Sequence, residues 1–221
     1  MWTVISLGGS VVVPDSIDTT FLKGFVALIQ RLLGAQRFVI ITGGGRTARQ
    51  YQAAARALGD VPDDELDWLG IHATRLNAQL LRAALRVHAA LISDPEHDAL
   101  PDAPVLIGAG WKPGCSTDYD AAVIAERVGA PRIINVSNTS HVYDKDPREF
   151  TDARPIERLT WDELLALIGD EWRPGLNAPF DPVAAKRCRA AGISAAIVSA
   201  DLANLEAALT HKPFVGTIVR P

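Results

Sequence analysis

The sequence feature that most constrains the fold is an apolar strand that ends in three consecutive glycines and leads directly into a helix. Phe38–Ile41 are four apolar residues typical of a buried strand. The triplet Gly43–Gly45 follows, and Arg46–Leu58 then has the character of a helix that Gly59 ends. Glycines let an anion approach backbone N–H groups, and a helix N-terminus favours negative charge. The turn therefore predicts a phosphate site, although a tight turn without a ligand would have the same sequence.

The same arrangement occurs twice more along the chain. Trp2–Leu7 predicts a strand that ends at Gly8–Gly9, and Val105–Ile107 predicts one that ends at Gly108–Gly110. A helix over Asp118–Val128 follows the latter. Alternating strands and helices favour a parallel sheet with helices on both faces, whose ligands bind at the carboxyl ends of the strands. We therefore expect all three glycine turns at one edge of the sheet.

The remaining pattern extends this alternation to the C-terminus as one α/β domain with two lobes. Further strands are expected at His88–Ile92, Arg132–Val136, Ala195–Ser199 and Phe214–Val219, and further helices at Phe21–Leu33, Glu65–Val87, Trp161–Ile168, 182–191 and Leu202–Leu209. Expected helix N-caps are Thr117, Thr160 in a capping box with Glu163, and Asp181 before Pro182. Trp172–Ala178 is expected to be a loop.

The long helix over Glu65–Val87 carries two distinct faces. Its expected core stripe consists of Leu66, Leu69, Leu76, Leu80, Ala84 and Leu85. A second, small and polar face consists of Asp67, Gly70, Thr74 and Asn77. Taken by itself, this helix predicts that the polar face is solvated. The alternative is that Asp67 holds a sugar hydroxyl or a neighbouring subunit.

Composition excludes several classes of function. The net charge is −4 without a basic stripe, which argues against nucleic-acid binding. The two cysteines, Cys115 and Cys188, are far apart, which argues against a disulfide framework. The five histidines show no ligand spacing, and no apolar run is long enough to span a membrane. We expect a cytoplasmic protein, and Cys115 is a poor nucleophile candidate because no base is placed beside it.

Several phosphate-binding features together predict phosphoryl transfer. Three glycine-bearing strand ends provide more backbone donors than one phosphate needs, which suggests two phosphorylated ligands facing each other. Lys186, one turn into its helix, would reach toward an anion, the alternative being a surface lysine. Phosphoryl transfer depends mainly on positioning and charge neutralisation. The sequence has no GxxxxGK[ST] motif, so it is not a Walker-type P-loop protein.

Six segments resemble the amino-acid-kinase superfamily, and their order and spacing are most similar to uridylate (UMP) kinases of the archaeal type. They are LGGS at Leu7–Ser10, TGGGRTARQY at Thr42–Tyr51, DWLGIHATRLNAQLL at Asp67–Leu81, PGCSTDYDAAVIAE at Pro113–Glu126, VYDKDP at Val142–Pro147 and FDPVAAK at Phe180–Lys186. The resemblance extends from Ile5 to Thr217. It is less specific for the substrate than for the superfamily.

The resemblance implies a three-layer α/β/α sandwich with a mostly parallel central sheet. It implies a kinase that uses ATP and Mg²⁺ to convert UMP to UDP, a step of pyrimidine nucleotide biosynthesis. Residues 1–130 would form the phosphoacceptor-binding lobe and residues 131–221 the ATP-binding lobe. The family assembles as hexamers built from dimers. Two alternatives stay open: a kinase of the same fold for another small acceptor such as isopentenyl phosphate, and a non-catalytic relative that binds a nucleotide or oxyanion for storage or regulation.

Carried over by position, the resemblance implies three groups of site residues. Lys186, Gly9 and Asp118 would be catalytic. The ATP-binding residues would be Gly8, Gly9, Ser10, Gly45, Arg49, Ser137, Asn138, Tyr143 and Asp146. The acceptor-binding residues would be Gly44, Asp67, Trp111, Lys112, Pro113, Gly114, Cys115, Ser116 and Thr117.

The chain also departs from the family pattern at the expected site. Ser6 occupies a position where many members have lysine. Asn138 replaces an aspartate that positions two lysines in those members. Ser140 and His141 replace an Asp-Gly pair, which predicts a reshaped loop on the ATP side. Trp111, Lys112 and Cys115 replace threonine and two histidines in the acceptor loop, where a tryptophan would shrink or restack the base pocket.

Overall fold

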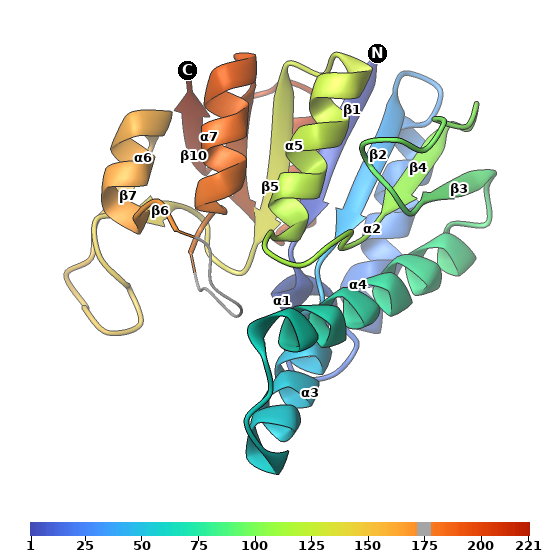
Figure 1. Cartoon of the computed structure of the whole chain (residues 1–221). Coiled ribbons are helices and arrows are strands. Elements are labelled where there is room, and N and C mark those ends of the chain that lie inside the picture. The colour runs from blue at the N-terminus through green and yellow to red at the C-terminus, as the bar shows by residue number, and fades with distance from the viewer. Residues whose placement is uncertain (172–177) are drawn as a thin grey trace.

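The computed structural model describes residues 1–171 and 178–221, and the expected loop at Trp172–Ala178 lies almost entirely outside them. Eight of its strands form one sheet in the order β3-β4-β2-β1-β5-β9-β10-β8. Their bounds are β1 Trp2–Leu7, β2 Arg37–Thr42, β3 Ala89–Ile92, β4 Val105–Gly108, β5 Arg132–Ser137, β8 Arg158–Thr160, β9 Ser194–Ser199 and β10 Thr217–Arg220. All neighbouring strands of this sheet run parallel except β9 and β10. The arrows of β1, β2 and β5 in Figure 1 therefore point to one common edge.

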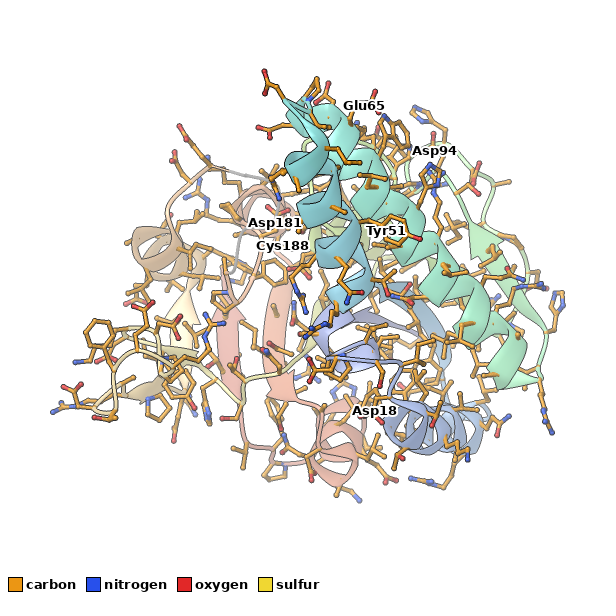
Figure 2. All side chains as sticks on the ribbon, turned by 90° about the horizontal axis from the view of Figure 1, so that it is seen from below. Asp18, Tyr51, Glu65, Asp94, Asp181 and Cys188 are labelled. Atoms are coloured by element: carbon orange, nitrogen blue, oxygen red, sulfur yellow. The ribbon has the colours of Figure 1, made fainter. Side chains whose placement is uncertain are left out.

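Helices cover both faces of the sheet, which confirms the expected three-layer α/β/α sandwich (Figure 1). The helices are α1 Gly9–Val12, α2 Thr19–Leu32, α3 Gly45–Leu58, α4 Asp63–Leu85, α5 Thr117–Val128, α6 Trp161–Ile168, α7 Pro182–Ala191 and α8 Leu202–Leu209. Helices α2, α4 and α8 pack on one face, and α5, α6 and α7 pack on the other. Seen from below in Figure 2, α3 and α4 lie side by side at the carboxyl edge.

The central strands are continuous apolar runs because both of their faces are buried. In β2, Phe38 and Ile40 join the core on one side of the sheet, and Val39 and Ile41 join the core on the other. All four are at most 1% exposed. A strand buried on both faces gains hydrophobic stabilisation at every position, so it shows no alternation with polar residues.

Most helix ends lie where local chemistry predicts them, with one correction. The capping box of Thr160 and Glu163 is present, and Asp181 caps α7. The N-cap of α5 is Ser116, however, and the prediction of Thr117 was wrong by one residue. Ser116 has the extended backbone of an N-cap, and its hydroxyl accepts a hydrogen bond from the Asp118 N–H.

The burial of α4 is the largest difference from expectation. Leu76 and Leu80, predicted as core residues, are 65% and 36% exposed. Asp67, Thr74 and Asn77, predicted as a solvated face, are all buried. The polar face is buried because α4 crosses the carboxyl ends of the strands, where backbone groups of the glycine turns need hydrogen-bond partners.

The C-terminal part contains short strands that the sequence did not predict. Strands β6 Val142–Tyr143 and β7 Pro155–Ile156 form a separate two-stranded sheet, and β8 adds an edge to the main sheet beside β10. Strand β10 begins at Thr217, later than the expected Phe214. Among the described residues, no helix is long and apolar enough to cross a membrane.

Candidate active site

The glycine turns after β1 and β2 touch each other through their backbones. A Cβ atom on Gly9 would lie 2.1 Å from the backbone nitrogen of Gly45, and one on Gly43 would lie 2.4 Å from the nitrogen of Gly9. Gly45 has a φ of +62°, which favours glycine. The turns that follow two parallel neighbouring strands therefore form one backbone surface, with no room for a side chain between them.

A cleft of about 610 Å³ opens over this surface. Most of the predicted site residues line it: Gly8, Gly9, Ser10, Gly44, Gly45, Arg49, Asp67, Cys115, Ser116, Thr117, Asp118, Ser137 and Asn138. The N-termini of α1, α3 and α5 meet here. Because backbone donors and helix dipoles favour anions, the cleft is suited to phosphate groups. The sequence prediction of one common edge is borne out by this geometry.

The two arginines after the triplet have different surroundings. Arg49 lines the cleft. Arg46 instead forms an exposed ion pair with Asp15, with a nitrogen–oxygen distance of 2.5 Å. Of these two arginines, only Arg49 therefore contributes positive charge directly to the cleft wall.

The acceptor loop, residues 111–117, is held to α4 by two backbone N–H groups, one just before the loop and one within it. The Gly114 N–H donates to Asp67 Oδ2 at 2.8 Å, and the Gly110 N–H donates to Thr74 Oγ1 at 2.8 Å. Asp67 is thus buried beside the loop, which contradicts the solvated-face prediction for this helix. Its carboxylate still lines the cleft, so it can accept a hydrogen bond from a ligand hydroxyl.

The tip of the acceptor loop is turned away from the cleft. Trp111, Lys112, Pro113 and Gly114 are absent from the described residues that line the cavity. The Lys112 ammonium lies 3.8 Å from the centre of the Trp111 ring, and His97 meets that ring edge-on. The expectation that Trp111 shrinks or restacks the base pocket is therefore not met in this structure.

Asp118 forms the centre of a hydrogen-bond network at the floor of the cleft. Its Oδ1 accepts from Ser6 Oγ at 2.6 Å and from Asn135 Nδ2 at 2.9 Å. Its Oδ2 accepts from the backbone N–H of Asp181 at 3.2 Å. Burial, with a contribution from the Asp181 charge, raises the pKa of Asp118 to about 6, although the Ser6 hydrogen bond opposes the shift. The carboxylate can therefore change its protonation state near neutral pH.

Asp181 connects the N-terminus of α7 to the acceptor loop. Its Oδ1 caps the helix by accepting from Val183 and Ala184, and its Oδ2 accepts from the Ser116 N–H at 2.9 Å. Cys115 lies just before this contact. Burial raises the pKa of its thiol to about 12, so it remains protonated and is a poor nucleophile.

Lys186 lies outside the cleft in this structure. Its ammonium donates to the Asp170 carbonyl at 2.8 Å and lies 3.4 Å from the Asp170 carboxylate. It is not among the described residues that line either cavity of the site. The sequence expectation that Lys186 reaches toward the anion site is therefore not met in this structure.

A second cavity of about 320 Å³ adjoins the cleft on the side of the C-terminal half. The four residues predicted for adenine and ribose, Ser137, Asn138, Tyr143 and Asp146, all line it. Ser137 and Asn138 line the cleft as well, so the two spaces are continuous. The glycine turns line only the larger of the two spaces.

The loop that departs from the family pattern is ordered by its own side chains. Ser140 Oγ lies 2.9 Å from His141 Nδ1 and 3.2 Å from the Tyr143 hydroxyl. The His141 ring packs edge-on against the Tyr143 ring. These contacts hold the turn without the glycine of the family pattern, and His141 becomes part of the cavity wall.

Several residues of the site were missed by sequence reasoning. Arg148 lines both cavities and pairs with Asp146 at 2.5 Å, which lowers the pKa of that carboxyl to about 2. Gln52 and Asn135 also line the cleft. Strand register could have indicated Asn135. This residue lies on β5 beside Ser6 of β1, near the end of the strand pair that carries the glycines.

Sequence comparison shows that the chain resembles known kinases over nearly its whole length. The family model described as "Amino acid kinase family" matches residues 1–199. A uridylate kinase of Methanospirillum hungatei is 37% identical, with 98% of this chain and 93% of that protein covered. A uridylate kinase of Thermoplasma volcanium is 35% identical, with 98% and 96% covered.

Solved structures give the same result for the fold. The uridylate kinase of Archaeoglobus fulgidus superposes with a TM-score of 0.84 at 31% identity, covering 99% of this chain and all of that one. The UMP kinase of Bacillus anthracis superposes with a TM-score of 0.78 at 18% identity, which shows the fold alone. The whole described architecture is therefore shared with these enzymes.

Proposed function

The chain belongs to the amino acid kinase family, and on that premise we propose that it transfers the γ-phosphoryl group of ATP to UMP to give UDP. The observation that carries the proposal is a cleft over the backbone surface made by Gly9 and Gly45, joined by a second cavity that shares Ser137, Asn138 and Arg148 with it. Uridylate kinases that are similar to this chain over nearly its full length support the choice of acceptor.

The geometry suggests a division of the site between the two nucleotides. The cavity lined by Tyr143 and Asp146 would take the adenosine of ATP, and the cleft beside Asp67 would take UMP. The phosphates of both would then lie over Gly9, Gly44 and Gly45, whose N–H groups would stabilise the charge that develops on the transferred group. No general base is needed, since positioning and charge neutralisation supply most of the catalysis.

Mg²⁺ would enter with ATP and neutralise phosphate charge. Magnesium in such sites is held by one or two carboxylates together with substrate phosphates. Asp118 is a carboxylate at the cleft floor and fits this limited requirement. Within the described residues, no group of three His, Cys, Asp or Glu side chains is placed to hold a metal by itself.

We assign Lys186 the neutralisation of charge on the transferred phosphoryl group. It would have to leave Asp170, an exposed contact that contributes little to stability. Its position one turn into α7, whose N-terminus adjoins Ser116 and Asp118, supports this role. Apo structures often hold catalytic side chains away from their working positions.

The decisive experiment is an ADP-release assay of the purified protein with ATP·Mg²⁺ and a panel of acceptors. Turnover with UMP well above other nucleoside monophosphates is the expected result. Preferred turnover with isopentenyl phosphate or an amino acid would instead support the second kinase hypothesis. Nucleotide binding in a thermal-shift assay with no transfer to any acceptor would favour a storage or regulatory protein.

We further propose that the chain forms a homo-oligomer, as the family resemblance implies. The outer side of α3 and α4 exposes Tyr51, Trp68, Leu76 and Leu80, with Tyr51 labelled in Figure 2. Apolar side chains exposed on adjacent helices are typical of subunit interfaces. Light scattering of the wild type and of Leu76→Glu would test this: the wild type should be a hexamer, and the variant should dissociate.

A further inference from the structure

The buried polar face of α4 has a consequence for catalysis that depends on the proposed kinase function. We propose that Asn77 is a positioning residue, whose carboxamide fixes the Gly43–Gly45 turn so that its N–H groups stay aimed at the phosphates. Asn77 lies on α4, is only 4% exposed, and does not line the cleft among the described residues. Its role is therefore exerted through the turn and not through contact with a ligand.

The contact between Asn77 and the turn is direct. Its Nδ2 donates to the Gly43 carbonyl at 2.8 Å and lies 3.4 Å from the Gly44 carbonyl. A peptide group is planar, so fixing the carbonyl of one residue also fixes the direction of the next N–H. Holding the carbonyls of Gly43 and Gly44 therefore sets the directions of the Gly44 and Gly45 N–H groups.

A run of three glycines needs hydrogen bonds from other parts of the protein to hold it in one conformation. Glycine has the largest backbone freedom of any residue, so an unrestrained triplet would sample many conformations. The neighbouring strand β1 holds one end, where the Gly43 N–H donates to the Leu7 carbonyl at 2.9 Å. The other end is held at Arg46, whose N–H donates to the Val13 carbonyl at 2.9 Å. Between these two points, Asn77 restrains the carbonyl side of the turn.

The same helix also holds the acceptor loop. Thr74 binds the Gly110 N–H, and Asp67 binds the Gly114 N–H. Three polar side chains on one face of a rigid helix thus place the phosphate turn and the acceptor loop in fixed register. Catalysis by preorganised donors requires this kind of rigidity, because donors that must reorient during the reaction lose much of their effect.

The test compares Asn77→Ala and the isosteric Asn77→Asp with a matched control, Gln30→Ala. Gln30 also donates from a side-chain amide to a backbone carbonyl, that of Leu85 at the far end of α4. All variants are first checked for folding by thermal denaturation. The readouts are kcat, KM for each substrate, and amide hydrogen exchange of the segment 43–48.

We expect Asn77→Ala to lower kcat about 10- to 100-fold, less than the loss of a whole oxyanion donor, with each KM changed less than about threefold. Exchange in segment 43–48 should accelerate, and Gln30→Ala should show neither effect. Asn77→Asp should lose at least as much, since its charge would face two carbonyls. A kcat within about twofold of wild type, unchanged exchange in the turn, or an equal loss in Gln30→Ala would overturn the proposal.

Failure of the proposed function is distinguished by the wild type. If wild type phosphorylates another acceptor instead of UMP, the kcat ratios are measured with that acceptor and still test Asn77. If it phosphorylates none, hydrogen exchange of the turn alone decides: acceleration in Asn77→Ala without acceleration in Gln30→Ala supports the restraint, and its absence refutes it.

Discussion

The two halves of the site differ in how much backbone and how many side chains line them. The cleft beside α3 and α4 has one wall of bare backbone, where the turns at Gly8–Gly9 and Gly43–Gly45 touch without side chains between them, and side chains such as Arg49 and Asp67 line the rest of it. The adjoining cavity is lined by side chains of the segment that follows β5, among them Tyr143 of β6, Asp146 and Arg148. Backbone walls tolerate no substitution, whereas side-chain walls can be exchanged residue by residue. The transferring phosphoryl group would face the first kind of wall and the adenosine the second.

Substitution in the backbone wall should have the largest effect. We expect Gly9→Ala to lower kcat roughly 1,000-fold or more and to destabilise the fold by about 3 kcal/mol. The added Cβ would lie 2.1 Å from the Gly45 nitrogen, and backbone on both sides prevents relaxation. Gly34→Ala is the control, because nothing lies within 4 Å of its Cβ. A soluble Gly9→Ala variant with wild-type kinetics would show that the turns do not stay in contact.

Removal of the proposed catalytic cation should have the next largest effect. Lys186→Ala is expected to lower kcat about 100-fold while nucleotide affinity changes little, since its charge would act mainly on the transition state. Steady-state kinetics and equilibrium binding of ATP separate the two quantities. Arg189→Ala, on the same helix and paired with Asp162, is the control. Near-normal kcat in Lys186→Ala would mean that Lys186 stays with Asp170 and that the cleft works without it.

The Asp118 carboxylate at the floor of the cleft should make kcat depend on pH. If ionised Asp118 is the active form, kcat should fall about tenfold per pH unit below about 6, the pKa to which burial raises this group. Asp118→Asn should lose this limb and be about tenfold slower at pH 8. A wild-type profile that is flat between pH 5 and pH 8, on the scale of an order of magnitude, would exclude ionised Asp118 from the rate-limiting step.

The same group contributes to stability with a definite sign. Its pKa in the folded protein is raised from 3.8, so the fold favours the protonated form. The stabilisation is complete below pH 3.8 and is lost as the pH rises through about 6. Thermal denaturation of wild type and Asp118→Asn across this range should therefore differ in slope.

Substitution of one side chain in the cleft or one in the adjoining cavity should have the smallest effects, each on the KM of one substrate. Asp67→Asn is expected to raise KM for the acceptor about tenfold and leave KM for ATP within twofold, because Asp67 lines only the cleft among the two described cavities. Asp146→Asn should raise KM for ATP about threefold and leave the acceptor unaffected, since Asp146 is more exposed and lines the other cavity. Equal effects of both variants on both substrates would contradict the division of the site.

Much of the fold could be predicted because its signals are local. Unbroken apolar runs predict β1 and β2, glycines predict strand ends, and the capping box at Thr160 predicts the start of α6. These patterns depend on neighbours within a few residues, so no knowledge of distant contacts is needed. The family resemblance added the arrangement of ligands, which strand and helix patterns alone do not contain.

The site could be predicted less completely because its partners are distant in sequence. Helix α4 alone favours Leu76 over Asn77 as a core residue, and the structure has the reverse. Nothing near Asp118 in the sequence indicates Ser6, which lies 112 positions away and donates to it. The rotamer of Lys186 likewise depends on Asp170, 16 positions earlier.

The sequence by itself determined that three strands end in glycine at one edge of a parallel sheet, a pattern that predicts a phosphate site. Only the tertiary structure decided that Gly9 and Gly45 are in backbone contact and that Asn77 faces the turn. The physical reason is that hydrophobic periodicity reports how a segment meets an apolar core. Hydrophobic periodicity does not predict which face of a helix is buried where the helix packs against unpaired backbone groups, because burial of polar side chains is favourable there.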